Sequence, residues 1–284
     1  MSKAQIPTNT HYSIAEMVIA APDIHFPLAN MSLLEKFYAF VEERYQEFLD
    51  KKYAHFTIVQ MGDICDFDTF SKYLTDPRSA TSATKAIEQA RAFFAHLRKI
   101  APLARICFKE GNHDVRLQKY ILEKAPALIE LAELDLNHLY HLEKNGVEFF
   151  RTTDRLVLEG GLKLTHGDRH SSAGSSYTAM AELRACEAGL SMITAHIHTF
   201  AHVFTPDRFA LVCGYFGSME PGAFKYIGDR LPTCRAGFAV ALRIRMDERD
   251  KRGRFRGSKT QWVAQPVEAF GPKHDSFFYG GKIY

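Results

Sequence analysis

The segment that decides the fold is RICFKEGNHD, residues 105–114, in which an apolar run ends in glycine, asparagine, histidine and aspartate. The apolar character of residues 105–109 predicts a short strand, and Gly111 marks where it stops. The same pattern occurs twice earlier in the chain. Residues 56–61 (FTIVQM) precede Gly62-Asp63, and residues 17–21 (MVIAA) precede Pro22-Asp23. The sequence therefore predicts three strands, each followed at once by polar residues.

Two amphipathic helices are expected between these strands. Residues 32–49 carry apolar side chains at helical spacing. Residues 84–100 follow the same pattern, with Thr81 or Ser82 as the expected N-terminal cap. Strands that alternate with helices are typical of a parallel sheet, so the first half of the chain is expected to be α/β.

The pattern changes after Val115. Two helical stretches are expected up to about residue 134, interrupted by Pro126, and a further helix at 177–188. No linker divides the chain, so we expect one domain, residues 1–284, with two sheets. The last two strands are expected to form a C-terminal hairpin, residues 238–270, over the polar run 247–259. The further strands are expected at 149–150, 155–158, 162–165, 192–195, 209–213, 238–246 and 261–267.

Composition excludes several classes of protein. The chain of 284 residues is 46% hydrophobic and 24% charged, which is typical of a globular protein and not of a disordered one. Its longest stretch without Asp, Glu, Lys or Arg is residues 188–206, which include three histidines, whereas a membrane-spanning helix needs about 20 predominantly apolar residues. The first residues contain no apolar core of a secretory signal, and the five cysteines form no CxxC pair. We therefore expect a cytoplasmic protein with reduced thiols and no membrane partner.

Metal-ligating residue types follow five of the predicted strands. Asp, Asn and His supply oxygen and nitrogen ligands without thiolate, which suits Mn²⁺, Fe, Zn²⁺, Ni²⁺ or Co²⁺. Because ligands collect beyond the carboxyl ends of strands in α/β sheets, the five strand ends are expected to converge. Seven ligands are too many for one ion but fit two ions that share a carboxylate. The seven candidates are Asp23, His25, Asp63, Asn112, His166, His196 and His198.

The order of these residues resembles that of the calcineurin-like metallophosphoesterases. The matching blocks span residues 23–198, about 60% of the chain, and five blocks in order after apolar runs are a specific signal. The resemblance implies an α/β sandwich with two central mixed β-sheets flanked by helices. The blocks are Asp23-x-His25, Gly62-Asp63-x-x-Asp66, Gly111-Asn112-His113-Asp114, His166 and His196-x-His198.

The resemblance also implies a role for each matching residue. His113 would protonate the leaving oxygen or stabilise charge on the phosphate, and Asp66 would hydrogen-bond His113 and keep it protonated. The nucleophile would be metal-bound hydroxide, with Mn²⁺ the ion expected to support activity in an assay. One ion would be held by Asp23, His25 and His198, and the other by Asn112, His166 and His196, with Asp63 bridging both.

One position departs from the family pattern. The family usually has Gly-His-x-His in the last block, whereas this chain has Ala195 before His196. The additional methyl group forbids little backbone geometry unless φ is positive. The segment 66–78 also resembles stand-alone members found in phage and prophage genomes, which is a less specific match.

Three residues beside the predicted ligands are candidates for binding substrate phosphate. Arg116 follows the Gly-Asn-His-Asp block, and Arg169 and His170 follow His166. A guanidinium group can bind phosphate through two hydrogen bonds. An exposed charge is the alternative for the two arginines, and an ordinary loop histidine is the alternative for His170.

A basic run lies near the C-terminus. Residues 243–259 hold eight Lys or Arg and three Asp or Glu, a local net charge of +5. Such a run can contact a nucleic-acid backbone, although hairpin turns are also commonly charged for solubility. We therefore expect a dinuclear phosphodiesterase or nuclease that acts on nucleotides or nucleic acid. A phosphomonoesterase for a nucleotide, metabolite or phosphoprotein and a catalytically silent scaffold are the alternatives, and the sequence leaves the oligomeric state open.

Overall fold

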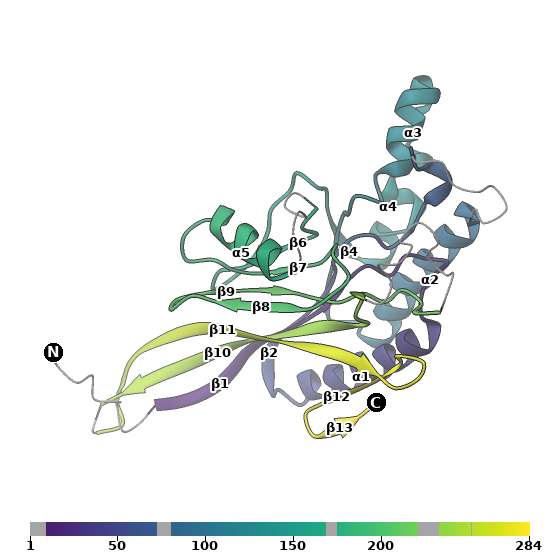
Figure 1. Cartoon of the computed structure of the whole chain (residues 1–284). Coiled ribbons are helices and arrows are strands. Elements are labelled where there is room, and N and C mark those ends of the chain that lie inside the picture. Colours follow the sequence, from purple (N-terminus) through teal and green to yellow (C-terminus); the bar gives the residue numbers. More distant parts are fainter. Residues whose placement is uncertain (1–9, 73–80, 169–174, 221–232, 251) are drawn as a thin grey trace.

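Two β-sheets lie face to face in the computed structural model, which describes residues 10–72, 81–168, 175–220, 233–250 and 252–284 (Figure 1). Helices cover the outer faces of both sheets. The architecture therefore has four layers, from helices through two sheets to a further helix. This is the predicted fold class, two central mixed β-sheets flanked by helices, and it is confirmed.

The larger sheet has eight strands in the order β13-β12-β11-β10-β1-β2-β3-β4. Strand β1 is central, parallel to β2 and antiparallel to β10. The parallel pairing continues from β2 through β3 to β4. The strands are β1 (Thr10–Ala21), β2 (Tyr53–Gln60), β3 (Arg105–Lys109), β4 (Val147–Phe150), β10 (Gly237–Arg249), β11 (Phe255–Phe270), β12 (Ser276–Tyr279) and β13 (Lys282–Ile283).

The smaller sheet has five strands in the order β5-β6-β7-β9-β8. Its middle strands β6, β7 and β9 are parallel, and the edge strands β5 and β8 are antiparallel to their neighbours. The strands are β5 (Leu156–Leu158), β6 (Leu162–Thr165), β7 (Ser191–Thr194), β8 (Ala201–Phe204) and β9 (Phe209–Val212).

The helices begin where the sequence provides caps. Asn30 accepts a hydrogen bond from the backbone N–H of Leu33 at the start of α1, and Ser82 does the same for Lys85 at the start of α2. The α-helices are α1 (Met31–Leu49), α2 (Ala83–Ile100), α3 (Arg116–Lys124), α4 (Leu136–Leu139) and α5 (Ser175–Ala185), and the 3₁₀ turns are η1 (Asp68–Phe70), η2 (Pro126–Leu128), η3 (Ala132–Leu134) and η4 (Glu143–Asn145).

Strand β1 is buried on both of its faces. Met17 and Ile19 pack into the core beneath α1 and α2, whereas Val18 and Ala20 pack against the smaller sheet. Neighbouring side chains on a strand point to opposite faces, so an unbroken apolar run suits a strand between two layers. This explains why residues 17–21 are continuously apolar.

Most of the expected elements form, and the differences have physical causes. The second helical stretch before residue 134 is replaced by η2 and η3, because Pro126 lacks a backbone N–H and ends α3. Strand β8 was not predicted, nor were β12 and β13. Among the described helices, none is long and apolar enough to cross a lipid bilayer.

The C-terminal hairpin differs from the expected arrangement. Strands β10 and β11 pair as far as residues 249 and 255, so most of the polar run 247–259 is strand rather than turn. The cause is tertiary, because the polar start of β1 pairs with β10 and continues the sheet there. Arg243 is not part of a basic tip. It is buried and forms ion pairs with Glu16 and Glu159.

Candidate metal centre

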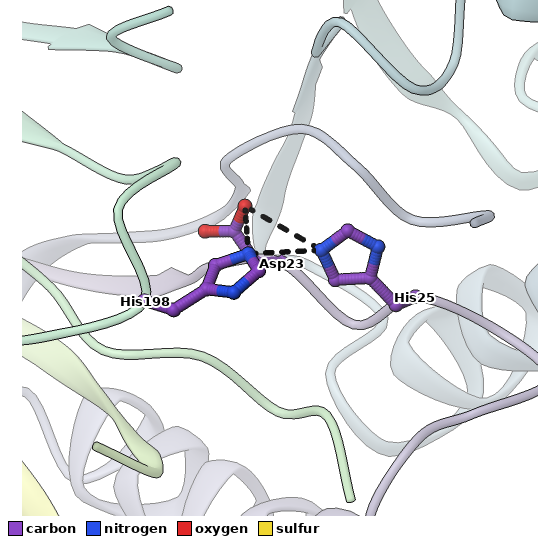
Figure 2. A group of neighbouring side chains, drawn as sticks. All are labelled: Asp23, His25 and His198. Atoms are coloured by element: carbon purple, nitrogen blue, oxygen red, sulfur yellow. Dashed lines mark hydrogen bonds and ion pairs between the residues drawn. The ribbon is translucent and has the colours of Figure 1, made fainter. Parts of the chain in front are cut away.

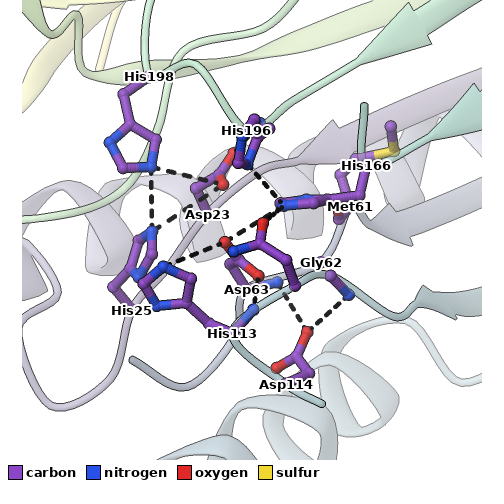
Figure 3. Close-up of polar contacts among 12 residues, drawn as sticks. Asp23, His25, Met61, Gly62, Asp63, His113, Asp114, His166, His196 and His198 are labelled. Atoms are coloured by element: carbon purple, nitrogen blue, oxygen red, sulfur yellow. Dashed lines mark hydrogen bonds and ion pairs between the residues drawn. The ribbon is translucent and has the colours of Figure 1, made fainter. Parts of the chain in front are cut away.

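Polar side chains from five strand ends meet at one edge of the two sheets (Figure 3). They follow β1, β2 and β3 of the larger sheet and β6 and β7 of the smaller one. Within each sheet these strands are parallel, so their carboxyl ends lie at the same edge. All seven predicted ligands lie in this cluster: Asp23, His25, Asp63, Asn112, His166, His196 and His198.

The first group of possible ligand atoms comes from Asp23, His25 and His198 (Figure 2). Nε2 of His25 lies 3.0 Å from Nε2 of His198, and Oδ1 of Asp23 lies 3.9 and 3.6 Å from these two nitrogens. Two ligands about 2.1 Å from one ion are about 3.0–3.4 Å apart at angles of about 90–110°. Among the described residues, nothing donates a hydrogen bond to the buried Oδ1 of Asp23. A buried oxygen that faces two imidazole nitrogens fits a cation.

The second group comes from Asp63, His166 and His196. Nε2 of His166 lies 3.2 Å from Oδ2 of Asp63, 3.3 Å from Nδ1 of His196 and 2.9 Å from Oδ1 of Asn112. Nδ1 of His166 donates a hydrogen bond to the carbonyl oxygen of Met61 at 2.9 Å. Nδ1 therefore keeps its proton when the ring is neutral, and Nε2 is then the lone-pair nitrogen, which is how a second partner prepares a histidine to bind metal.

Asp63 lies between the two groups (Figure 3). Its Oδ1 accepts the backbone N–H of His113 at 2.7 Å, and its carboxylate also forms a third possible metal group with His25 and His113. The position suits the predicted bridging ligand. The assignment of particular residues to each ion, and of His113 to proton transfer rather than metal binding, stays a prediction.

Asp66 is buried beneath two of the histidines. Its Oδ1 lies 3.1 Å from Nδ1 of His25 and 3.1 Å from Nδ1 of His113. Burial acts to raise the pKa of Asp66, but the hydrogen bonds from His113 and His25 lower it well below its usual range. The carboxylate therefore stays ionised and orients both rings, whereas the sequence had linked it to His113 alone.

Of the three residues predicted to bind phosphate, Arg116 lies in the described part of the chain, while Arg169 and His170 lie outside it, as do residues 73–78 of the phage-like segment. One guanidinium nitrogen of Arg116 lies 2.8 Å from Nε2 of His113, and another donates to the backbone oxygen of Asp66 at 2.9 Å. Because a guanidinium group only donates, Nε2 of His113 accepts in this arrangement. Asp66 orients the ring from the Nδ1 side at 3.1 Å, and its role in keeping His113 protonated stays a prediction.

Asp114 holds the loops together, and the sequence analysis gave it no role. It accepts the backbone N–H of Asp63 at 2.7 Å and that of Gly111 at 2.9 Å. It also accepts more distant contacts from Ile64 and Cys65. One buried carboxylate therefore ties the loop after β2 to the loop after β3. Its place beside His113 in a matching block was the signal that could have identified it.

Five of the seven predicted ligands have left-handed backbone conformations. Such conformations cost about 1–3 kcal/mol each for residues other than glycine, and they cluster at functional sites. The strained residues lie where the loops leave the strands. Their position favours a site whose side chains are held in place to bind a ligand. The φ values are 35° for Asp23, 54° for His25, 52° for Asp63, 72° for His196 and 54° for His198.

Two glycines are required by close approach. A Cβ atom on Gly111 would lie 2.3 Å from Oδ1 of Asp63, and one on Gly167 would lie 1.8 Å from Oγ1 of Thr194. Ala195 stands where the family usually has glycine, but its φ is not among the positive values. It is buried, and its N–H donates to the carbonyl oxygen of His166 at 3.0 Å. The extra methyl group is therefore accommodated.

The histidines have opposite protonation tendencies. Burial alone would lower the pKa of His166 and of His198, but Asp63 raises the first to about 10 and Asp23 raises the second to about 9. The pKa of His196 falls to about 4, through burial and then through the charge of His166. Two carboxylates thus attract positive charge into the centre, which a divalent ion would supply in place of protons.

Comparison with known proteins gives a limited sequence match. No protein-family model matches the chain. Gene 54 protein of Mycobacterium phage D29 is 29% identical over 153 residues, which cover 50% of this chain and 56% of that relative. The chain thus spans little more than half the length of the curated relative it matches.

Solved structures with a similar fold include two forms of Vps29. A Vps29 single mutant from Entamoeba histolytica is 13% identical, covers 88% of this chain and 99% of its own, and has a TM-score of 0.43. Vacuolar Protein Sorting 29 from Cryptosporidium parvum is 14% identical, with 89% and 100% covered and a TM-score of 0.42. A predicted phosphoesterase from Streptococcus pneumoniae is 13% identical, with 90% and 99% covered and a TM-score of 0.35.

The chain resembles the calcineurin-like metallophosphoesterases. The resemblance lies in the order of its motif blocks and in its two mixed sheets flanked by helices. The TM-scores are too low for the similar structures to support a conclusion about activity.

Proposed function

We propose that this protein is a metal-dependent phosphoesterase whose two divalent ions are held by the cluster around Asp63. The observation that carries the proposal is the pair of ligand groups on either side of Asp63, with His113 and Arg116 next to them. Bound ions of this kind make water nucleophilic near neutral pH and balance the charge of a phosphate. The oxygen and nitrogen donors suit Mn²⁺, Fe, Zn²⁺, Ni²⁺ or Co²⁺.

His113 would serve as the proton donor. Asp66 holds Nδ1 of His113, so Nε2 is the nitrogen that faces the site. In the absence of substrate, Nε2 accepts from Arg116 at 2.8 Å. A substrate phosphate would attract the guanidinium group, because charge-assisted bonds to an anion are stronger than a bond to a neutral ring. Once released, Nε2 would take up a proton from water and donate that proton to the leaving oxygen.

We favour a phosphodiester as the substrate. The sequence argument for this choice was the basic run at residues 243–259. Several of these residues form ion pairs with acidic residues in the hairpin, so the run gives this choice little support. The support comes instead from an open groove beside the centre, which leaves room for a second substituent on the phosphate. Contact with nucleic acid and a cytoplasmic location stay predictions.

A catalytically silent scaffold is the competing function. It would keep the fold without a need for strained ligand backbones or for a proton donor held by a buried carboxylate. The five left-handed ligand residues and the contact between His113 and Asp66 therefore favour an enzyme.

The test is hydrolysis of two nitrophenyl esters by protein loaded with Mn²⁺. We expect bis(4-nitrophenyl) phosphate to be hydrolysed faster than 4-nitrophenyl phosphate, with activity lost after chelation and restored by Mn²⁺. Turnover of the monoester alone would make the protein a phosphatase. Absence of turnover by protein that carries metal would support the scaffold.

A further inference from the structure

A groove of about 610 Å³ opens beside the metal centre, between η1 and α3. Asn112, a predicted ligand, lines the groove, and so does Arg116. Pockets that bind small molecules in proteins have volumes of roughly 300–1,000 Å³. The groove is therefore large enough for a group of nucleoside size attached to a phosphate at the centre.

One wall of the groove is aromatic. The rings of Phe70 and Tyr120 are 5.4 Å apart, and Phe70 packs on the buried Phe67 at 5.6 Å. Tyr120 is nevertheless 43% exposed. A large ring that is supported on one side and open on the other offers a surface on which a base can stack.

The groove is also positively charged. Its lining includes Arg116 and Lys119, while Lys124 and Glu123 pair with one another at 2.7 Å, so Arg116 and Lys119 make the lining positive. Within the described part of the chain, Lys119 has no carboxylate partner. Positive charge beside an aromatic surface is typical of sites for single-stranded nucleic acid.

The helix orders these groups along one direction. Lys119 follows Arg116 by three positions and Tyr120 follows it by four. Because residues three and four apart are neighbours on a helix, all three share one face of α3. Tyr120 is about 6 Å farther along the helix than Arg116, at about 1.5 Å per residue. A substrate whose phosphate lies near Arg116 thus has its adjoining nucleoside within reach of Tyr120.

We propose that this groove binds the nucleoside next to the scissile phosphate of a nucleotide phosphodiester, with its base stacked on Tyr120 and its next phosphate beside Lys119. The inference rests on the proposed phosphoesterase function and names its substrate class. It also assigns specificity to η1 and α3 rather than to the basic hairpin, which lies beyond the opposite end of β1 (Figure 1).

Binding can be tested without catalysis. The probe is fluorescein-labelled tetrathymidylate with phosphorothioate linkages, compared with an abasic analogue of the same charge by fluorescence anisotropy. We expect the wild type to prefer the thymidylate probe by about 5–150-fold, the range that stacking of one base gives. Tyr120→Ala should abolish this preference and Tyr120→Phe should keep it. Tyr12→Ala is the matched control, since Tyr12 is an exposed tyrosine at the other end of β1.

Equal binding of both probes by the wild type would overturn the inference, as would a preference that survives in Tyr120→Ala. Equal loss in Tyr12→Ala would also overturn it, because the base would then not be bound in the groove. Lys119→Gln should weaken the binding of both probes to a similar degree, because it removes a contact to phosphate.

Hydrolysis separates this inference from the proposed function. The substrates are thymidine 5′-(4-nitrophenyl phosphate) and methyl 4-nitrophenyl phosphate, assayed with Mn²⁺. We expect kcat/KM to favour the thymidine ester, and Tyr120→Ala to lose at least about five-fold more on that ester than on the methyl ester. Turnover of both esters without preference would reject the groove and keep the phosphoesterase. Turnover of neither would reject the phosphoesterase, and the anisotropy result would still decide the groove.

Discussion

The two ends of β1 carry polar residues in opposite circumstances. Beyond its carboxyl end, Asp23 and His25 are completely buried and have left-handed backbones. At its amino end, residues Thr10 and His11 pair with the charged end of β10 in an extended ribbon, and Tyr12 is 62% exposed. Both ends carry many polar and charged side chains. At the buried end, however, Oδ1 of Asp23 accepts no hydrogen bond from the described residues.

The carboxylates at the two ends make this difference concrete. Hydrogen bonds from Arg254 and Arg252 lower the pKa of Asp250 in the hairpin, and Arg256 also pairs with it. At the metal centre, burial acts to raise the pKa of Asp23, and His198 and His166 lower it. The hairpin carboxylate is neutralised by its own arginines. The buried one is left with histidines that are also suited to bind a metal, which is why function is assigned to that end.

Asp63→Asn should have the largest effect on the metal end. The carboxylate stands in two of the possible ligand groups, so its replacement should weaken both ions together and reduce turnover to that of metal-stripped protein. Elemental analysis after loading with Mn²⁺ measures this directly. Asp250→Asn is the matched control in the hairpin and should retain the full metal content. Loss of one ion only would mean that another residue forms the bridge.

His113→Ala should reduce the rate without removing metal. Loss of a general acid costs about 10²–10⁴-fold in rate. Steady-state kinetics and metal analysis on the same sample test both parts. His202→Ala, on β8, serves as control because its ring packs against Phe204 and Phe209 away from the cluster. Loss of metal from the His113 variant would make His113 a ligand.

Gly111→Ala should destabilise the loops by steric conflict. The new methyl group would lie 2.3 Å from Oδ1 of Asp63, and overpacking of this kind costs about 1–3 kcal/mol. Thermal unfolding of the metal-loaded protein measures this loss of stability. Gly257→Ala in the hairpin is the matched control, since nothing lies within 4 Å of its added Cβ. Equal stability of the two variants would mean that the loop after β3 is not tightly packed.

The effect of metal removal should depend on pH. In metal-free protein the pKa of His166 is raised to about 10 and that of His198 to about 9, above the usual value near 6.5. Their contribution to stability is therefore complete below about pH 6.5 and is lost as pH rises through 9–10. Metal binding needs neutral imidazole and strengthens over the same range. The difference in Tm between metal-loaded and chelator-treated protein should widen from pH 7 to pH 10, and a constant difference would contradict these protonation states.

The smallest effect is expected from the hairpin arginines. Replacement of Arg252, Arg254 and Arg256 by Gln should leave kcat/KM for bis(4-nitrophenyl) phosphate within about twofold, because the charge is distant from the centre and screened. The same variant tests nucleic-acid contact. Each lost phosphate contact should reduce the slope of log K for DNA binding against log salt concentration by about 0.9. An unchanged slope would mean that residues 243–259 are an exposed charged surface that does not contact nucleic acid. A large loss of turnover would contradict the separation of the two ends.

The sequence predicted the centre better than the hairpin for a physical reason. Buried strands between two layers require apolar runs, and polar residues at their ends stand out against them, as Asp23 does after β1. The hairpin strands are exposed on much of their surface, so their charged residues resembled a turn. Asp114 was missed as a structural residue because its four backbone contacts arise only when two loops meet.

The most direct test of the account is anomalous diffraction from crystals of Mn²⁺-loaded protein, collected at the manganese edge. The account predicts two peaks about 3.5–4 Å apart with the Asp63 carboxylate between them, one beside His25 and His198 and the other beside His166 and His196. A single peak, or none in fully loaded protein, would contradict the two-ion centre.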